Sequence, residues 1–329
     1  MPSTASPPVQ PADGDDIVLP FHLVASRMSG RLLRLGGVVD EILTRHAQPE
    51  PVSHALGEAI GLTALFATGL KFDSRFSNGR FIFQTKSDGP LGMLVVHYDL
   101  PGHLRGYARM AKDRVGEVTA SGRGDQVALL GEGHLAMTIE PGGKLDSYQG
   151  IVPLGGVTLT EAAHTYFRQS EQLPTFIRLA VARHFAGGQW RWRVGGLILQ
   201  YVPKAGGDAR PLNPAEAEAR DASLFGEDDE DWRRVRLLAE TVEDHELLDP
   251  MLSSERLLYR LFQEEGVAVS PAVQLAAQCR CSRERIGAFL DSFDPAELAT
   301  MVTPAGKIEV TCEFCSTVYA FEPGERAAG

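Results

Sequence analysis

The chain has 329 residues, of which 43% are hydrophobic and 23% are charged, as in an ordinary globular protein of about two domains. Its formal net charge of −11 argues against a nucleic-acid-binding protein, because an acidic surface repels phosphate backbones. Four cysteines are too few for a secreted disulfide scaffold, so we expect a soluble, cytoplasmic protein.

The N-terminal residues 1–16 read MPSTASPPVQPADGDD, with neither a basic start nor an apolar stretch. They therefore do not form a secretory signal, and we expect a disordered tail. The longest mostly apolar run, 55–70, contains Glu58 and is too short to span a bilayer. We accordingly expect no association with membranes.

Residues 17–203 mix helical and strand patterns and are expected to form one α+β core domain. Ser53 is a candidate N-cap for a helix, and Thr158 and Glu161 have the spacing of a capping box. The helices are expected at 40–46, 53–70 and 158–168. The strands are expected at 32–39, 80–85, 91–98, 104–110 and 192–202, with a hairpin formed by 127–130 and 135–140.

The composition changes in the segment 204–250, which we interpret as a charged helical linker. Residues 204–249 hold 14 acidic and 6 basic residues, a net charge of −8, and five consecutive acids occupy 227–231. Helical spacing of apolar residues then predicts an amphipathic helix, formed by Trp232, Val235, Leu238, Ala239 and Val242. Two interpretations stay open: a plain domain linker, or a marginally stable segment whose folding can be switched.

The C-terminal segment 251–329 opens with a predicted helix near 250–265 and contains every cysteine of the chain. One residue separates Cys279 from Cys281, two separate Cys312 from Cys315, and thirty lie between the pairs. Two close pairs brought together by the chain between them form a tetrahedral four-thiolate site, which favours zinc. We predict one Zn²⁺ per chain, held by all four cysteines in a small zinc-binding domain.

A structural zinc site is the usual role of such a cluster, but two features favour a reactive one. Arg280, Arg283 and Arg285 surround the first pair, and positive charge favours thiolate over thiol. A domain this small often depends on its metal for folding, so oxidation of the ligands would remove its support. The arginines could equally form a solvated helix face.

Motifs for nucleotide use or hydrolysis are missing from the sequence: there is no GxxxxGK[ST], HExxH or GxSxG. The Cys312 to Cys315 pair has thioredoxin-like spacing, but no βαβ pattern follows it. We therefore expect no enzymatic activity and assign no catalytic residue. A thiol-disulfide oxidoreductase and a constitutive structural zinc module remain as alternatives.

The two most specific stretches are CRCSRERI at 279–286 and GKIEVTCEFC at 306–315. They resemble the redox-regulated 33 kDa heat-shock chaperonin family of bacteria, and the similarity extends over about 18–322. Further matches are LLYRLFQEE at 257–265, YFRQSEQLPT at 166–175, LRGYARM at 104–110 and PLGGVTLTEAA at 153–163. The departures are a longer polar N-terminal tail and Ser316, which stands where asparagine or glycine is common.

The resemblance implies an ATP-independent holdase chaperone that is inactive while its four cysteines bind zinc. It implies that oxidative stress joins Cys279 to Cys281 and Cys312 to Cys315 as redox-active disulfides, releases zinc and activates the chaperone. It also implies a helical linker folded over the core domain. The implied partners are unfolded or partly folded client proteins, and a second copy of the chain in an activated homodimer.

Overall fold

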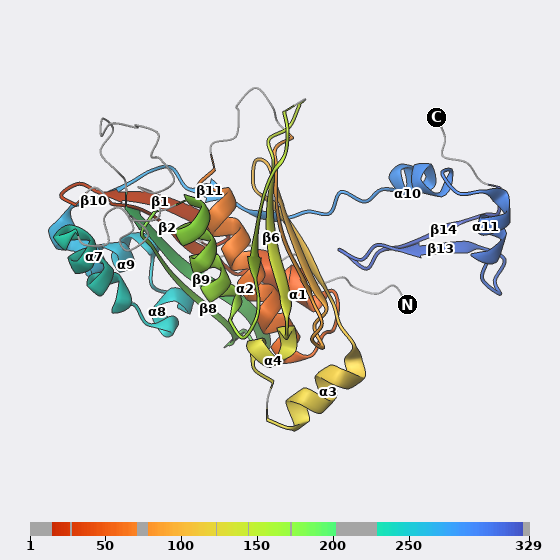
Figure 1. Cartoon of the computed structure of the whole chain (residues 1–329), viewed down its shortest axis with the longest axis horizontal. Helices are drawn as coiled ribbons and strands as arrows, with labels where there is room; N and C mark the ends of the chain where they lie inside the picture. The colour runs from red at the N-terminus through yellow and green to blue at the C-terminus, as the bar shows by residue number, and fades with distance from the viewer. Residues whose placement is uncertain are drawn as a thin grey trace, which may run out of the picture.

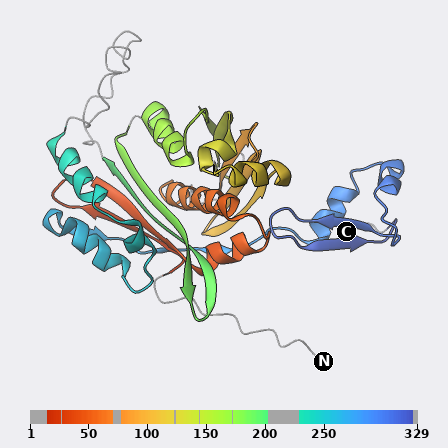
Figure 2. The same ribbon diagram turned by 90° about the horizontal axis from the view of Figure 1, so that it is seen from below.

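The computed structural model describes residues 15–26, 28–70, 78–122, 124–143, 145–171, 173–201 and 229–324. Most of the expected N-terminal tail and residues 204–228 of the expected linker lie outside these ranges. The described part is a mixed α+β structure, as predicted. Its layers follow one another from α7–α9 through a first sheet, the helix α2 and a second sheet to a C-terminal unit (Figure 1, Figure 2).

The first sheet is antiparallel and has the strand order β10-β1-β2-β9-β8, with β11 also paired to β1. Its residues alternate between two apolar surfaces: in β1, Val18 faces the main core, whereas Leu19 and Phe21 face a second apolar cluster. Its strands are β1 (Ile17–Leu23), β2 (Met28–Leu35), β8 (Thr175–Ala186), β9 (Gln189–Tyr201), β10 (Val267–Val269) and β11 (Val273–Gln274).

The second sheet has the order β12-β5-β4-β3-β6-β7, and all its pairs are antiparallel except β12 with β5. The predicted strands at 80–85, 91–98, 104–110 and 135–140 are confirmed, because their alternating apolar residues line one buried face. The strands are β3 (Arg80–Ser87), β4 (Met93–Asp99), β5 (His103–Arg109), β6 (Gly133–Glu140), β7 (Tyr148–Pro153) and β12 (Ala276–Ala277).

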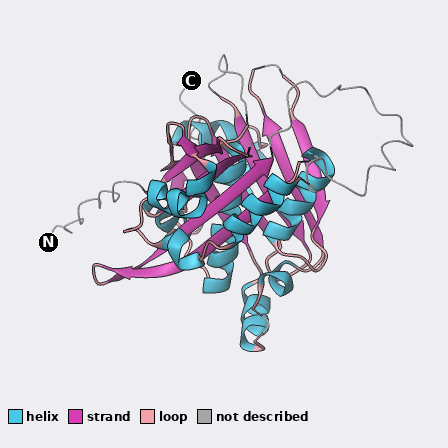
Figure 3. Ribbon diagram, turned by 90° about the vertical axis from the view of Figure 1, so that its left-hand side faces the viewer, coloured by secondary structure: helices cyan, strands magenta, loops and turns pink. Residues whose placement is uncertain are grey.

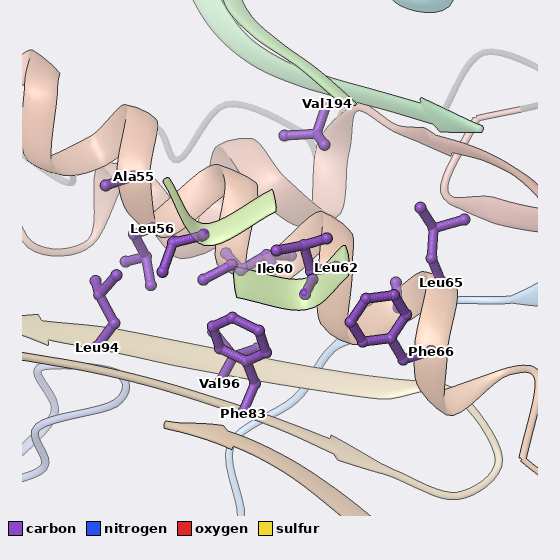
Figure 4. Close-up of a cluster of buried hydrophobic side chains, with 14 of the residues drawn as sticks. Ala55, Leu56, Ile60, Leu62, Leu65, Phe66, Phe83, Leu94, Val96 and Val194 are labelled. Carbon is purple, nitrogen blue, oxygen red and sulfur yellow. The ribbon is translucent and has the colours of Figure 1, made fainter. Parts of the chain in front are cut away.

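Helix α2 (Glu50–Ala67) lies between the two sheets and is buried on nearly every side. Leu56, Ile60 and Phe66 point toward Phe83 and its neighbours on the second sheet, as Figure 4 shows. The opposite side of α2 carries glycines where the first sheet comes close. A Cβ on Gly61 would lie 2.8 Å from the Leu179 side chain, so glycine permits this close approach.

The remaining core helices are α1 (Gly37–Thr44), α3 (Lys112–Ala120), α4 (Gln126–Leu130), α5 (Leu159–Tyr166) and the π-helical turn η1 (Phe167–Glu171). The capping box of Thr158 and Glu161 is confirmed. The strand predicted at 127–130 is wrong, because the Asp125 carboxylate accepts the Ala128 N–H and caps a helix there. Ser53 is not an N-cap, since α2 begins three residues earlier.

A layer of helices covers the outer side of the first sheet (Figure 3). It consists of α7 (Glu230–Glu240), α8 (Asp244–Leu248), α9 (Ser254–Phe262) and the 3-10 turn η2 (Gln263–Glu265). The predicted amphipathic helix is therefore present as α7. The proposed boundary at residue 250 stays a prediction; α9, β10 and β11, which follow it, pack on the first sheet.

The C-terminal unit holds α10 (Arg283–Leu290), α11 (Pro295–Thr300) and the hairpin β13 (Ile308–Thr311) with β14 (Val318–Phe321). Figure 1 shows it beside the second sheet, on the opposite side of the molecule from α7–α9. Its buried apolar cluster consists of Leu290, Ile308 and Phe321. Within the described residues, no helix is both long and apolar enough to cross a membrane.

Candidate metal centre

The structure brings the four predicted cysteines together, and all four are free thiols. Their sulfur atoms all lie within 4.8 Å of one another. Cys279 Sγ lies 3.7 Å from Cys312 Sγ, and Cys281 Sγ lies 3.3 Å from Cys315 Sγ. Four ligands about 2.3 Å from a tetrahedral zinc ion stand about 3.8 Å apart, so the cluster has the dimensions of such a site.

Local hydrogen bonds hold the turn of the second cysteine pair and cap the helix that follows the first pair. The β13–β14 turn is closed by the Cys312 N–H bonded to the Thr317 carbonyl at 2.9 Å and the Ser316 N–H bonded to the Cys312 carbonyl at 2.8 Å. Ser316 has a φ of 58°, in the left-handed region that asparagine and glycine adopt most easily. The first pair follows β12, and the Ser282 hydroxyl caps α10 directly after it.

Burial and local hydrogen bonds set the charge of the sulfurs. Burial raises the pKa of Cys281 to about 12, although the Tyr319 hydroxyl donates to its sulfur at 3.2 Å. Burial also raises the pKa of Cys312. At Cys315 burial acts in the same direction, but hydrogen bonds with Thr317 and with the neighbouring thiols outweigh it and lower the pKa to about 6. Without a cation, therefore, the thiols do not all ionise at neutral pH.

The three arginines near the first pair have partners other than the sulfurs. Arg280 forms an ion pair with Asp99 at 3.0 Å, and Arg285 donates to the Arg280 carbonyl at 2.9 Å. The guanidinium of Arg283 lies 4.5 Å from the centre of the Phe321 ring. The interpretation that these arginines activate the thiols is therefore not supported. The Thr317 hydroxyl, two residues after Cys315, helps to lower the pKa of that thiol, and the spacing of the cysteines alone gave no signal for it.

The sequence matches the model of the family described as Hsp33 protein over residues 16–322. The chain belongs to the Hsp33 family. A curated relative from Caulobacter vibrioides strain NA1000 / CB15N, named 33 kDa chaperonin, is 44% identical over 310 residues, covering 94% of this chain and 95% of the relative. A 33 kDa chaperonin from Vibrio cholerae serotype O1 is 30% identical over 298 residues, covering 91% of this chain and 89% of the relative.

The crystal structure of the 33 kDa chaperonin from Thermotoga maritima has the same fold as this Hsp33 chain. It superposes with a TM-score of 0.69 at 21% sequence identity, covering 94% of this chain and 96% of the other. The similarity therefore includes the core sheets, the covering helices and the cysteine-bearing unit. The resemblance inferred from the cysteine motifs is confirmed, and the curated relatives carry a chaperonin name.

Proposed function

We propose that this Hsp33 chain is an ATP-independent holdase chaperone, inactive when reduced and metal-bound, and activated by oxidation of its cysteines. The observation that carries the proposal is the four-sulfur cluster at the end of a chain whose preceding helices cover an apolar sheet face. The proposed partners are unfolded or partly folded client proteins, and a second copy of the chain after activation.

Zinc is the metal that we propose for the reduced state. Cys279, Cys281, Cys312 and Cys315 would hold it, because soft sulfur donors in a tetrahedral arrangement favour this ion. Bound zinc supplies the positive charge that keeps all four sulfurs ionised despite their burial. The chain contributes the two turns that hold the sulfurs at ligand spacing.

Removal of the covering helices would expose a continuous apolar surface. Trp232 and Val235 of α7 are buried against the outer side of the first sheet, where Leu19, Phe21 and Leu199 lie. The opposite side of that sheet is already occupied by α2 and the main core. Exposed apolar surface of this kind is what an unfolded chain binds, so uncovering it supplies a holdase function.

A short strap connects the cysteine centre to these helices. After α9, the chain pairs with β1 through β10 and β11, and then with β5 through β12. Backbone bonds from Leu275 to Asp16 and from Ala276 to Gly102 hold it to both sheets. Because β11 and β12 have two residues each, we expect unfolding at Cys279 to spread along the strap toward α9.

The test is suppression of aggregation of a thermally unfolding client by the reduced and by the peroxide-treated protein. A redox-gated chaperone suppresses aggregation only after oxidation and releases its metal. A protein that loses metal without gaining this activity is a structural zinc module, and one that turns over small disulfides is an oxidoreductase. Either result would overturn the proposal.

We expect the oxidised protein to contain disulfides within the pairs, Cys279 with Cys281 and Cys312 with Cys315. Each forms from two thiolates that give two electrons to a peroxide, which takes up protons and is reduced to water. The shortest sulfur contacts in the reduced cluster join Cys279 to Cys312 and Cys281 to Cys315. Loss of the metal separates the two turns, whereas each pair stays together on its own turn.

Peptide mapping of the oxidised protein, after proteolysis between residues 282 and 311, distinguishes the two patterns. Linkages within pairs leave the two cysteine peptides separate without reduction. If the two cysteine peptides are recovered mainly joined to each other, disulfides have formed between the pairs, along the shortest sulfur contacts of the reduced cluster. That result would contradict the expected pairing.

A further inference from the structure

A cluster of basic and aromatic side chains at the outer face of the second sheet contacts Phe314, one of the two residues between Cys312 and Cys315. Phe314 rests there, on the side of β4 and β5 that faces away from α2. We call this surface the aromatic seat; it is formed by His46, His97, Arg105, Tyr107 and Arg109.

The seat contacts the Phe314 ring from three directions. The Arg105 guanidinium carbon lies 4.2 Å from the ring centre, a cation–π distance. The Tyr107 ring meets it edge-on, with centres 4.8 Å apart and planes at 80°. The His97 ring lies 5.0 Å away. These contacts suit any planar aromatic side chain and do not involve the sulfurs.

The seat also contacts the residue before the ring and the backbone after it. Arg109 donates to both carboxylate oxygens of Glu313, at 3.1 and 3.4 Å. His46 Nε2 lies 3.2 Å from the Phe314 carbonyl oxygen, and His46 Nδ1 lies 3.1 Å from the Ser316 hydroxyl. A neutral ring with its proton on Nε2 satisfies both bonds. Burial lowers the pKa of His46, which favours that neutral form.

The seat residues are positioned by the sheet itself. Arg105 donates to His97 Nδ1 at 2.9 Å, and these two residues are paired across β4 and β5. The pKa of His97 is about 3, because of its burial and the charges of Arg105 and Arg80, so its ring is neutral. The Tyr107 hydroxyl lies 3.8 Å from Met93 Sδ on the neighbouring strand. The seat residues therefore have partners within the sheet that do not involve Phe314.

We propose that the aromatic seat is a docking site for extended client segments in which an acidic residue directly precedes an aromatic one, and that Glu313 and Phe314 occupy it as a built-in competitor. The inference rests on the proposed chaperone function for the existence of clients. The contacts of the seat define the chemistry of its occupant. They require an aromatic ring, a carboxylate on the residue before it, and the backbone carbonyl of the aromatic residue. An exposed acid–aromatic pair in any unfolded chain carries all three.

The competitor sits at the point where oxidation changes the chain. Glu313 and Phe314 are the two residues between Cys312 and Cys315. A disulfide between these cysteines therefore changes the conformation of the turn that places the Phe314 ring in the seat. Arg280, enclosed by the other pair, ties the same unit to Asp99 on β4 at 3.0 Å. These contacts of the cysteine unit with the second sheet are thus made by residues that lie between paired cysteines.

The test uses full-length, reduced, zinc-loaded protein and a fluorescently labelled, end-blocked peptide containing Glu-Phe within a glycine-serine sequence. Phe314→Ala removes the aromatic ring of the competitor and leaves Glu313 in place, and we expect this variant to bind the peptide about tenfold more tightly than the parent. A peptide with Lys-Phe in place of Glu-Phe should bind more weakly, because Arg109 repels lysine. Metal analysis of Phe314→Ala checks that the cysteine centre remains loaded.

A second substitution locates the binding. Tyr107→Ala added to Phe314→Ala should abolish the gain, whereas Tyr148→Ala, an exposed tyrosine on β7 of the same sheet, should leave it intact. Equal peptide binding by the parent and Phe314→Ala, or a gain that survives Tyr107→Ala, would overturn the proposal. If oxidised parent still suppresses aggregation in that case, the chaperone function stands and the seat alone is refuted.

Discussion

Metal removal from the reduced protein is expected to unfold residues 279–324 while the two-sheet core stays folded. The buried apolar cluster of this segment consists of Leu290, Ile308 and Phe321. Burial of each contributes about 1.5–3 kcal/mol. A structural zinc site contributes about 10–16 kcal/mol in small zinc-binding units, which is more than the burial of these three side chains together.

Amide hydrogen exchange of reduced protein, with and without a zinc chelator, measures this effect. We expect the amides of β13 and β14 to lose protection by orders of magnitude, while those of β2 and β9 keep theirs. Restoring one equivalent of zinc should restore the protection, and Cys312→Ser should reproduce the loss without chelator. Undiminished protection of β13 and β14 in metal-free protein would show that the segment folds without its metal.

The metal cluster could be predicted from the sequence because the two cysteines of each pair are close together in the chain. Each pair of cysteines lies within one turn, and the chain between the pairs has only to return to its starting point. The polar partners of the sulfurs were not predicted, although Thr317 and Tyr319 are close in sequence. A hydroxyl beside a cysteine is common, and only the hairpin register determines which one points at a sulfur.

The strands β3, β4, β5 and β6 of the second sheet were likewise predictable, since alternation of apolar residues such as Phe81 and Phe83 marks one buried face, whereas β7 and β12 were not predicted. The segment 127–130 was misassigned because glycines on either side of Glu132 suggested a hairpin, whereas the Asp125 cap favours a helix. The seat for Phe314 was not predictable. It joins His46, the strands β4 and β5, and residue 314, which are brought together by the tertiary fold and by no sequence periodicity.

Trp232→Ala is expected to make the reduced, zinc-loaded protein an active chaperone. Trp232 is 3% exposed and anchors α7 on the outer face of the first sheet. Truncation of a buried tryptophan costs about 3–5 kcal/mol. The remaining ties of this layer include surface ion pairs, such as Arg178 with Asp244 at 2.7 Å, and exposed pairs of this kind contribute about 0–1 kcal/mol each. Val235 of α7 and Leu247 of α8 stay buried, so loss of the anchor should loosen this layer and make activity partly independent of oxidation.

Leu237→Ala is the matched control, because Leu237 is an apolar residue of the same helix that is 64% exposed. Both variants should bind one zinc, but only Trp232→Ala should suppress client aggregation when reduced and show faster amide exchange over 230–248. If Trp232→Ala loosens the helices and remains inactive, the face beneath them does not bind clients. The chelation experiment perturbs the cysteine centre, at one end of the strap, and Trp232→Ala perturbs the helices at its other end. Together the two experiments decide whether the effect of metal loss reaches the client surface through α7–α9.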